Sequence, residues 1–239
     1  MLNDFISELK TCPYYDCIFN GHDVIMIYVA GSRLYGVTDS LSDYDLIVVV
    51  NEKKYTERNM YLTYEGKKVH WYYIPLKMIL SMEMEQASAL NFFGNTIFGF
   101  IDDDKVVYEN PNYKNTISAL KSEKYNIGLM GVATFYNSQT KHVEAVLSAG
   151  TVEKEQCSKL LSHLCVASYF VLGEEIGKDF ITSVKRIRWQ PVCDEYKQKI
   201  VERFRLLKEY LDKHPVDITS TSETIYAKII SNSEIQREE

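Results

Sequence analysis

The feature that most constrains this chain is a small-residue turn between two apolar runs, the second of which opens with paired acids. The run Val24–Ala30 ends at Gly31 and Ser32, and Asp43 and Asp45 open the next run. β-Branched residues favour strands, and strand side chains alternate with a period of two, so both carboxylates should project from one face. Two such carboxylates can hold one hard cation, while the glycine lets the backbone approach a phosphate and the serine adds a hydroxyl donor. The pattern therefore predicts a phosphate-and-metal site.

Turn chemistry offers a purely structural interpretation of the same residues. Gly-Ser turns are common after strands, and Asp supports local backbone turns. This interpretation gives no reason for Asp43 and Asp45 to share one face, so the combination favours a nucleotide site.

At these residues the chain resembles the polymerase β nucleotidyltransferase superfamily, whose signature is a Gly-Ser turn, about ten residues of loop, and Asp-x-Asp on the following strand. The fuller wording, GSRLYG at residues 31–36 and SDYDL at residues 42–46, is most similar to predicted nucleotidyltransferases of bacterial and phage RNA-repair contexts. The resemblance extends over about residues 20–110. It implies an α+β fold, in which an α/β nucleotidyltransferase core with a small mixed β-sheet flanked by helices precedes a C-terminal helical bundle.

The resemblance also implies a reaction. Gly31 and Ser32 would bind the β- and γ-phosphates of a nucleoside triphosphate, and Asp43 and Asp45 would ligate the Mg²⁺ ions that bridge those phosphates. The reaction would be nucleotidyl transfer, a displacement of pyrophosphate at the α-phosphorus in which two metals clamp the attacking and departing oxygens. Mg²⁺ suits such a site because it accepts one or two carboxylates and takes its other ligands from water and phosphate.

The family has a third acid on a neighbouring strand, and this chain departs from that pattern. The matching strand is residues 67–74, after a hairpin turn at Glu65 and Gly66, and His70 occupies the expected position. His70 then replaces the carboxylate as general base, favours a softer metal such as Mn²⁺, or marks a site that binds nucleotide without transfer. A fourth interpretation is a shifted register, with His70 a half-buried strand residue and Glu65 the nearest acid.

Four further residues are candidates for nucleotide binding. Arg33 can neutralise charge that develops on the leaving pyrophosphate, and Tyr35 stacks on the nucleotide or only packs. Lys159 and His163 lie one turn apart on an expected helix, so both can face the same cleft. By resemblance, Lys159 would contact the triphosphate and His163 the nucleotide or acceptor; a surface lysine and a core histidine are the alternatives.

Periodicity predicts two unequal domains. Asn110 and Pro111 mark a break, which gives a nucleotidyltransferase catalytic domain at 1–111 and a C-terminal helical domain at 112–239. Asp102–Asp104 is expected to be a solvated turn, because three consecutive acids cannot share a face. The expected elements are a helix at 2–10, strands at 24–30 and 43–50, a hairpin at 59–64 and 67–74, a helix at about 76–88, an edge strand at 106–108, helices from 113 onward, and a docking or frayed segment at 225–230.

Composition limits the remaining possibilities. No apolar run among the 239 residues approaches the ~20 residues that span a bilayer, and the N-terminus lacks a secretion pattern, which predicts a cytoplasmic protein without membrane contact. The five cysteines form no C-x-x-C pair, so a zinc ribbon is not indicated. A net charge of −6 argues against a broad nucleic-acid surface, although Lys185–Trp189 and the lysines and arginines after it form a local basic stretch that suits an RNA end or a solvated helix face.

Two classes of function remain open. The first is an Mg²⁺-dependent nucleotidyltransferase whose acceptor is an RNA end, a small hydroxylated molecule or a protein side chain. The second is a degenerate relative that binds nucleotide or RNA and regulates a partner without turnover. The identity of the residue at the third-acid position, His70, separates the two.

Overall fold

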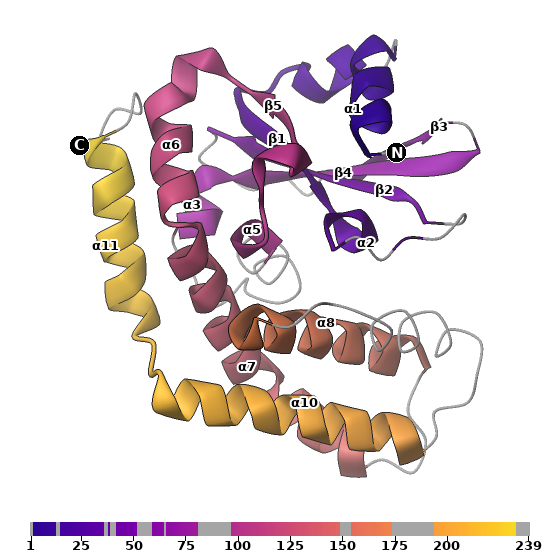
Figure 1. Ribbon diagram of the computed structural model, residues 1–239, viewed down its shortest axis with the longest axis vertical. Coiled ribbons are helices and arrows are strands. Elements are labelled where there is room, and N and C mark those ends of the chain that lie inside the picture. Colours follow the sequence, from indigo (N-terminus) through magenta and orange to yellow (C-terminus); the bar gives the residue numbers. More distant parts are fainter. Residues whose placement is uncertain are drawn as a thin grey trace.

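The computed structural model describes residues 2–12, 15–35, 38, 42–51, 59–64, 66–80, 97–148, 154–173 and 194–232 (Figure 1). The strands are β1 (Val24–Ala30), β2 (Tyr44–Val50), β3 (Asn59–Tyr64), β4 (Lys67–Pro75) and β5 (Val106–Glu109). The longer helices are α1 (Leu2–Thr11), α6 (Lys114–Ser122), α7 (Lys124–Ser148), α8 (Lys154–Leu172), α10 (Asp194–Lys213) and α11 (Ile218–Ser231). Short helical turns are η1 (Tyr15–Phe19), α2 (Gly31–Leu34), α3 (Leu76–Leu80), α5 (Ile97–Gly99), η4 (Asp103–Lys105) and η5 (Pro111–Tyr113).

The strands form one mixed sheet in the order β3-β4-β2-β1-β5. β1 pairs antiparallel with β2 and with β5, β2 pairs parallel with β4, and β3 and β4 form the predicted antiparallel hairpin. Gly66 in the hairpin turn has φ +76°, a conformation that glycine adopts without steric cost. The predicted strands and the predicted edge position of β5 are therefore confirmed.

The two faces of the sheet are covered by different parts of the chain. α1 and η1 cover one face, where Leu9 and Ile18 are buried against Val48 and Trp71. The Tyr73 hydroxyl donates to the Ile18 carbonyl at 2.8 Å and fixes η1 to β4. The other face packs against the helices that follow the sheet, as Figure 1 shows.

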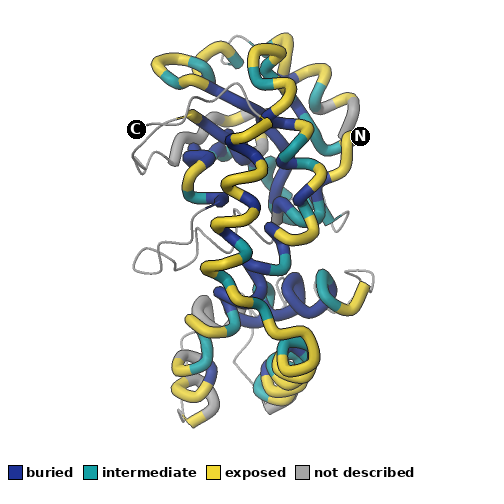
Figure 2. The backbone as a smooth tube through the Cα atoms, turned by 90° about the vertical axis from the view of Figure 1, so that its left-hand side faces the viewer, coloured by how far each residue is buried: buried dark blue, intermediate teal, exposed yellow. Residues whose placement is uncertain are grey.

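The core on this second face draws on both sides of the predicted domain boundary. Ile47 and Val49 of β2 share a buried cluster with Ile117 of α6, Ile127 of α7 and Ile225 of α11. A second cluster joins α7, α8 and α10. Figure 2 shows buried backbone continuing from the sheet into the helices. The fold is therefore α+β, as predicted, with its first helices packed directly on the sheet.

The C-terminal helix α11 is a docking helix, which confirms one of the two expectations for this segment. It packs against α3, α6 and α7. The Ser222 hydroxyl donates to the Leu80 carbonyl of α3, and Lys228 pairs with Glu123 beside α7. The expected helix at 76–88 is seen as α3, and the remainder of that range lies outside the described residues.

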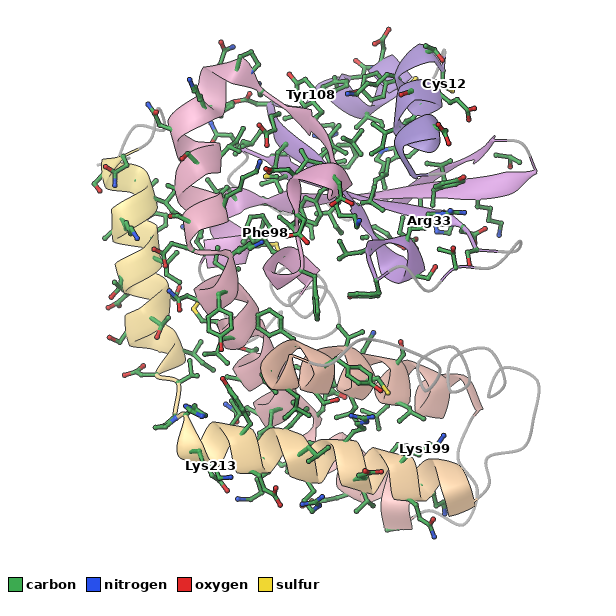
Figure 3. The ribbon with its side chains drawn as sticks, viewed as in Figure 1. Cys12, Arg33, Phe98, Tyr108, Lys199 and Lys213 are labelled. Atoms are coloured by element: carbon green, nitrogen blue, oxygen red, sulfur yellow. The ribbon has the colours of Figure 1, made fainter. Side chains whose placement is uncertain are left out.

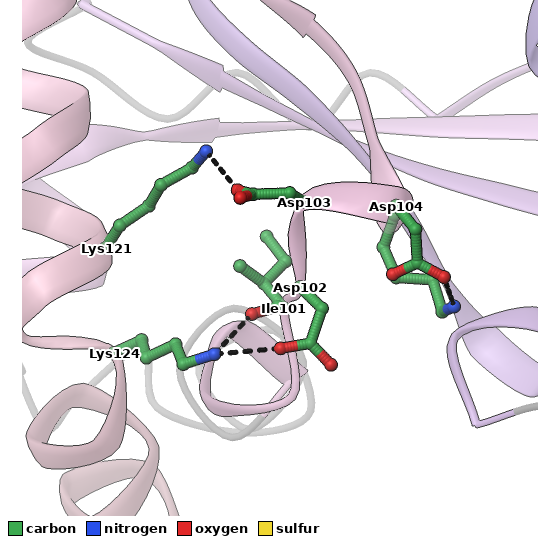
Figure 4. A network of polar contacts seen from close by, with 7 residues as sticks. Ile101, Asp102, Asp103, Asp104, Lys121 and Lys124 are labelled. Atoms are coloured by element: carbon green, nitrogen blue, oxygen red, sulfur yellow. Dashed lines mark hydrogen bonds and ion pairs between the residues drawn. The ribbon is translucent and has the colours of Figure 1, made fainter.

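The acidic run at 102–104 forms the turn η4, as predicted. Figure 4 shows Lys121 paired with Asp103 at 2.7 Å and Lys124 paired with Asp102 at 3.0 Å. Lys124 also donates to the Ile101 carbonyl at 2.8 Å, so lysines of α6 and α7 hold this turn against the helices. Across the described part of the chain, no helix has the length and hydropathy that a membrane span requires.

Candidate active site

The sheet places the acid pair and His70 on adjacent strands. In the β1–β2 ladder Ala30 lies opposite Asp45, and in the β2–β4 ladder Asp45 lies opposite His70. The His70 Nδ1 atom is 3.6 Å from the Asp45 Oδ1 atom, and both side chains are about a third exposed, at 31% and 29%. An imidazole and a carboxylate therefore face the same partly open space at the end of the central strand.

Gly31 brings the small-residue turn directly onto this carboxylate. Its φ is +62°, and a Cβ atom added there would lie 2.2 Å from the Asp45 Oδ2 atom. A side chain at this position would both strain the backbone and displace the acid. Ser32 follows in α2 and is half-buried. The turn and the acid pair, separate in the sequence, thus form one site.

Asp43 lies immediately before β2 and contacts the start of β4. Its Oδ1 atom accepts a hydrogen bond from the Lys68 backbone N–H at 3.3 Å. The carboxylate is half-buried and is held beside the strand that carries His70. The predicted placement of both acids near one strand end agrees with this arrangement.

Arg33 bridges the turn and the segment that enters β2. Its Nε donates to the Asp43 carbonyl at 3.1 Å, and its Nη2 donates to the Ser42 carbonyl at 2.8 Å. The guanidinium carbon lies 3.6 Å from the centre of the Tyr44 ring. Figure 3 shows Arg33 between α2 and the neighbouring strands.

Tyr35, directly after α2, packs toward the helices. Its ring meets Phe100 edge-on at 5.2 Å, and Phe100 meets Phe170 of α8 in the same way at 5.1 Å. Burial and the nearby Asp45 charge raise the pKa of the Tyr35 phenol, which therefore stays protonated at neutral pH. The Tyr35 ring therefore packs against Phe100, and its stacking on a nucleotide stays a prediction.

The environment of Asp45 disfavours its negative charge. Burial raises the pKa of its carboxyl, and the charge of Asp43 acts in the same direction, while His70 and Arg33 act against this rise. A bound divalent cation would offset the burial of this charge. Such a cation would therefore stabilise the ionised form of Asp45.

The donor set fits a hard metal whose coordination is completed from elsewhere. Asp43 and Asp45 supply carboxylate oxygens, which Mg²⁺ prefers, and the His70 nitrogen suits Mn²⁺ better than Mg²⁺. Among the residues that the structure describes, no three His, Cys, Asp or Glu side chains are grouped to hold a metal by themselves. Phosphate oxygens and water would have to supply the remaining ligands, which is the usual situation for Mg²⁺.

The structure says less about the two candidate residues in the helical region, Lys159 and His163. Lys159 lies in α8, and its side chain is outside the described residues. His163, one turn later, is half-buried, and its ring meets Phe135 of α7 edge-on at 6.0 Å. Their roles toward a triphosphate stay predictions.

The basic stretch is described only in its second part, because residues 174–193, including Lys185–Trp189, lie outside the described ranges. On α10, Arg205 pairs with Glu209 and Lys208 pairs with Asp212 one turn later. Acidic partners on the same helix therefore neutralise these two cations, as expected for a solvated helix face.

Tyr72 is a site residue that the sequence interpretation missed. It lies on the same face of β4 as His70, is half-buried, and has a pKa raised first by burial and then by the Asp45 charge. The period of two from His70 was the signal for it, because alternate residues of a strand share one face and Tyr72 is the next residue on the face of His70.

The comparisons with known proteins agree with the class that the Gly-Ser turn and the acid pair predict, a nucleotidyltransferase. Residues 17–94 match the family model described as nucleotidyltransferase domain, which confirms the predicted resemblance to the polymerase β superfamily over this region. A solved structure of a nucleotidyltransferase-like protein from Exiguobacterium sibiricum is similar with a TM-score of 0.33 and 10% identity, over 97% of this chain and 81% of that chain. Among curated proteins, none matches this chain.

Proposed function

We propose that this protein is a divalent-metal-dependent nucleotidyltransferase that moves a nucleoside monophosphate from a nucleoside triphosphate to an acceptor hydroxyl and releases pyrophosphate. The observation that carries the proposal is the contact of the Gly31 backbone with the Asp45 carboxylate, beside Asp43 and His70. A bound metal must contact carboxylate oxygens and phosphate oxygens at the same time. The phosphate-binding turn therefore has to lie next to the metal-binding acids, as Gly31 lies next to Asp45.

In this proposal each residue has a defined task. Gly31 and Ser32 bind the β- and γ-phosphates, and Asp43 and Asp45 would hold Mg²⁺ or Mn²⁺. When bound, the metal supplies Lewis-acid stabilisation of the attacking and leaving oxygens. His70 accepts the proton of the acceptor hydroxyl, whose oxygen bonds to the α-phosphorus while the bond to the β-phosphate oxygen breaks.

The second candidate function is nucleotide binding without turnover. The observation that favours it is the pairing of His70 with Asp45, because an imidazole at the position where the resemblance predicts a third carboxylate would be a poor ligand for Mg²⁺. The acceptor in the first proposal remains one of three kinds: an RNA end, a small molecule or a protein. We also propose the division into a catalytic domain at 1–111 and a helical domain at 112–239, with Lys159 and His163 of the latter serving nucleotide binding.

Pyrophosphate release from each of the four nucleoside triphosphates, with Mg²⁺ and with Mn²⁺, tests the proposal. Asp45→Asn should lower the rate by about 10³-fold, because the metal loses a charged ligand at the reacting phosphates. Asp103→Asn is the matched control, since Asp103 is 90% exposed and pairs with Lys121 away from the site. Turnover that persists in Asp45→Asn would refute the proposed reaction, whereas a wild type that is inactive but melts at higher temperature with triphosphate would support the binding function.

His70→Asp separates the possible roles of the imidazole. Restoring the acid should raise Mg²⁺-supported turnover if the site is only weakened by the histidine. If His70 is the working base, the same change should instead shift the pH dependence of kcat and the ratio of Mn²⁺ to Mg²⁺ activity, with little gain in rate. An unchanged rate and pH profile would mean that His70 takes no part in the reaction.

A further inference from the structure

The side chain of Arg33 is bound to the polypeptide backbone that leads into the metal-binding strand. Two of its three guanidinium nitrogens donate to the consecutive carbonyls of Ser42 and Asp43, at 2.8 and 3.1 Å. The guanidinium carbon also lies over the Tyr44 ring, 3.6 Å from the ring centre. One side chain therefore holds three successive residues.

Ser42 and Asp43 need a partner such as Arg33 because both lie before the first residue of β2. The parallel ladder between β2 and β4 starts at Tyr44, opposite Val69. Asp43 lies before the ladder, and its own side chain is tied to β4 by one bond of 3.3 Å from the Lys68 N–H. The orientation of Asp43, and of the chain that delivers Asp45, thus depends on contacts made outside the sheet.

Arg33 makes these contacts from the turn that carries Gly31. It stands two residues after Gly31, whose backbone touches the Asp45 carboxylate. The turn and the acid segment are joined at two points, once through Gly31 and Asp45 and once through Arg33.

We propose that Arg33 is a positioning residue that holds the Ser42–Tyr44 segment so that Asp43 and Asp45 converge on a divalent cation. This inference rests on the proposed function for the identity of the two metal ligands. It assigns Arg33 a role that differs from neutralising the leaving pyrophosphate. The two roles require different properties of the side chain. A phosphate can be neutralised by any nearby cation, whereas two successive carbonyls and a ring face require the planar guanidinium group.

Arg33→Lys is the discriminating variant, since it keeps the charge and removes the fork. The affinity of the protein for Mn²⁺ alone, measured by electron paramagnetic resonance without nucleotide, should fall by about 10-fold, as is typical when a group that orients a metal ligand is lost. The Mg²⁺ concentration that gives half-maximal turnover should rise by the same factor. At saturating Mg²⁺ the KM for triphosphate should stay within about 2-fold of the wild type, because the phosphates keep their own contacts.

Tyr44→Leu tests the same idea without touching the charge. Removing the ring while leaving both carbonyl bonds should weaken Mn²⁺ binding by about 2- to 5-fold, the range that a cation–π contact accounts for. Arg205→Lys on α10 is the matched control, because that arginine is 56% exposed and pairs with Glu209. It should leave Mn²⁺ binding unchanged.

The outcomes separate the inference from the function on which it rests. Unchanged Mn²⁺ affinity in Arg33→Lys, with a raised KM for triphosphate in Arg33→Gln, would overturn the positioning role and assign Arg33 to the phosphates. A wild type that binds Mn²⁺ but releases no pyrophosphate would refute the transferase and leave the positioning role to be decided by the Mn²⁺ titrations alone. Wild-type protein that binds Mn²⁺ neither alone nor together with a non-hydrolysable nucleoside triphosphate would overturn both.

Discussion

Glycine permits a close approach at two places in this molecule, and the two places differ in what approaches. At the sheet end, a Cβ atom on Gly31 would lie 2.2 Å from the Asp45 carboxylate. At the junction with the helices, Cβ atoms on Gly99 and Gly128 would lie 2.5 and 2.4 Å from the Phe170 ring. The first glycine admits a charged group and the other two admit an aromatic ring.

The difference shows which contacts serve chemistry and which serve architecture. At Gly31 the chain keeps a partly buried charge whose ionised form burial disfavours, which opposes folding. At Gly99 and Gly128 the gain is close packing of α5, α7 and α8, which supports folding. The aromatic contacts from Tyr35 through Phe100 to Phe170 join the two places.

Gly31→Ala should have the largest effect of the changes that test this comparison. The new methyl group must displace the Asp45 carboxylate, and a misplacement of about 1 Å at a reacting centre lowers turnover by about 10²-fold. Pyrophosphate release with Mg²⁺ measures the loss, and Mn²⁺ titration shows whether it originates in metal binding. The backbone strain of alanine at φ +62° adds a stability loss of about 1–2 kcal/mol.

Gly66→Ala is the matched control, because it carries the strain without the contact. Its φ is +76°, and nothing lies within 4 Å of an added Cβ atom. We expect a similar loss of stability with unchanged turnover at saturating metal. If the two alanine variants lost turnover equally, backbone strain would explain Gly31 and its contact with Asp45 would have no special role.

Gly128→Ala should reverse the pattern, with a loss of stability and no loss of chemistry. An alanine in an unhindered helix interior is worth about 1 kcal/mol over glycine, but here its Cβ meets Phe170 and lies 2.9 Å from the Gly99 Cα atom. Crowding of this kind costs about 1–3 kcal/mol, so a net destabilisation is expected in urea unfolding. Turnover per folded molecule should stay at the wild-type value. A stabilised Gly128→Ala variant would mean that this junction yields easily to an added methyl group.

The sequence predicted the site around Asp45 better than the packing of Gly99 and Gly128 against Phe170, for a physical reason. Alternation with a period of two is a local property, so it set Asp43 and Asp45 on one face before any tertiary contact was known. The contact between Gly99, Gly128 and Phe170 depends on how three separate helices cross, which no local period encodes. That information exists only in the folded packing.

Two other features show the same limit. The charge of Arg33 indicated a phosphate, and only the positions of two backbone carbonyls show what its guanidinium binds. The break at Pro111 is correct as local punctuation, since a short turn begins there, yet Ile117 and Ile225 pack back onto the sheet. Local signals locate turns, whereas the extent of a core follows from where apolar faces meet.

The smallest expected effect is on the stability contributed by the contact between Glu123 and α11, which holds the fold together and lies outside the candidate site. The Glu123 carboxylate, 7% exposed as a residue, accepts hydrogen bonds from Lys228 of α11 and from Asn126 of α7, the latter at 2.8 Å. Burial works against the charged form, but these two partners outweigh it and hold the pKa of Glu123 below its ordinary value. The carboxylate therefore stabilises the fold only while it is ionised.

Glu123→Gln should lower the free energy of unfolding at pH 7 by about 1 kcal/mol, a modest value because the Lys228 side chain is 52% exposed and screened by water. Since the folded-state pKa is depressed, this contribution is present above the ordinary glutamate value of 4.5 and is lost as pH falls through the lower folded-state value. Urea unfolding at pH 7 and at progressively lower pH should show wild type and variant converging in acid. The control Glu223→Gln, at an exposed position of α11, should have no effect at either end of the pH range. A difference between wild type and Glu123→Gln that stayed constant with pH would show that glutamine disturbs the packing of α11 and that the ionised carboxylate contributes nothing of its own.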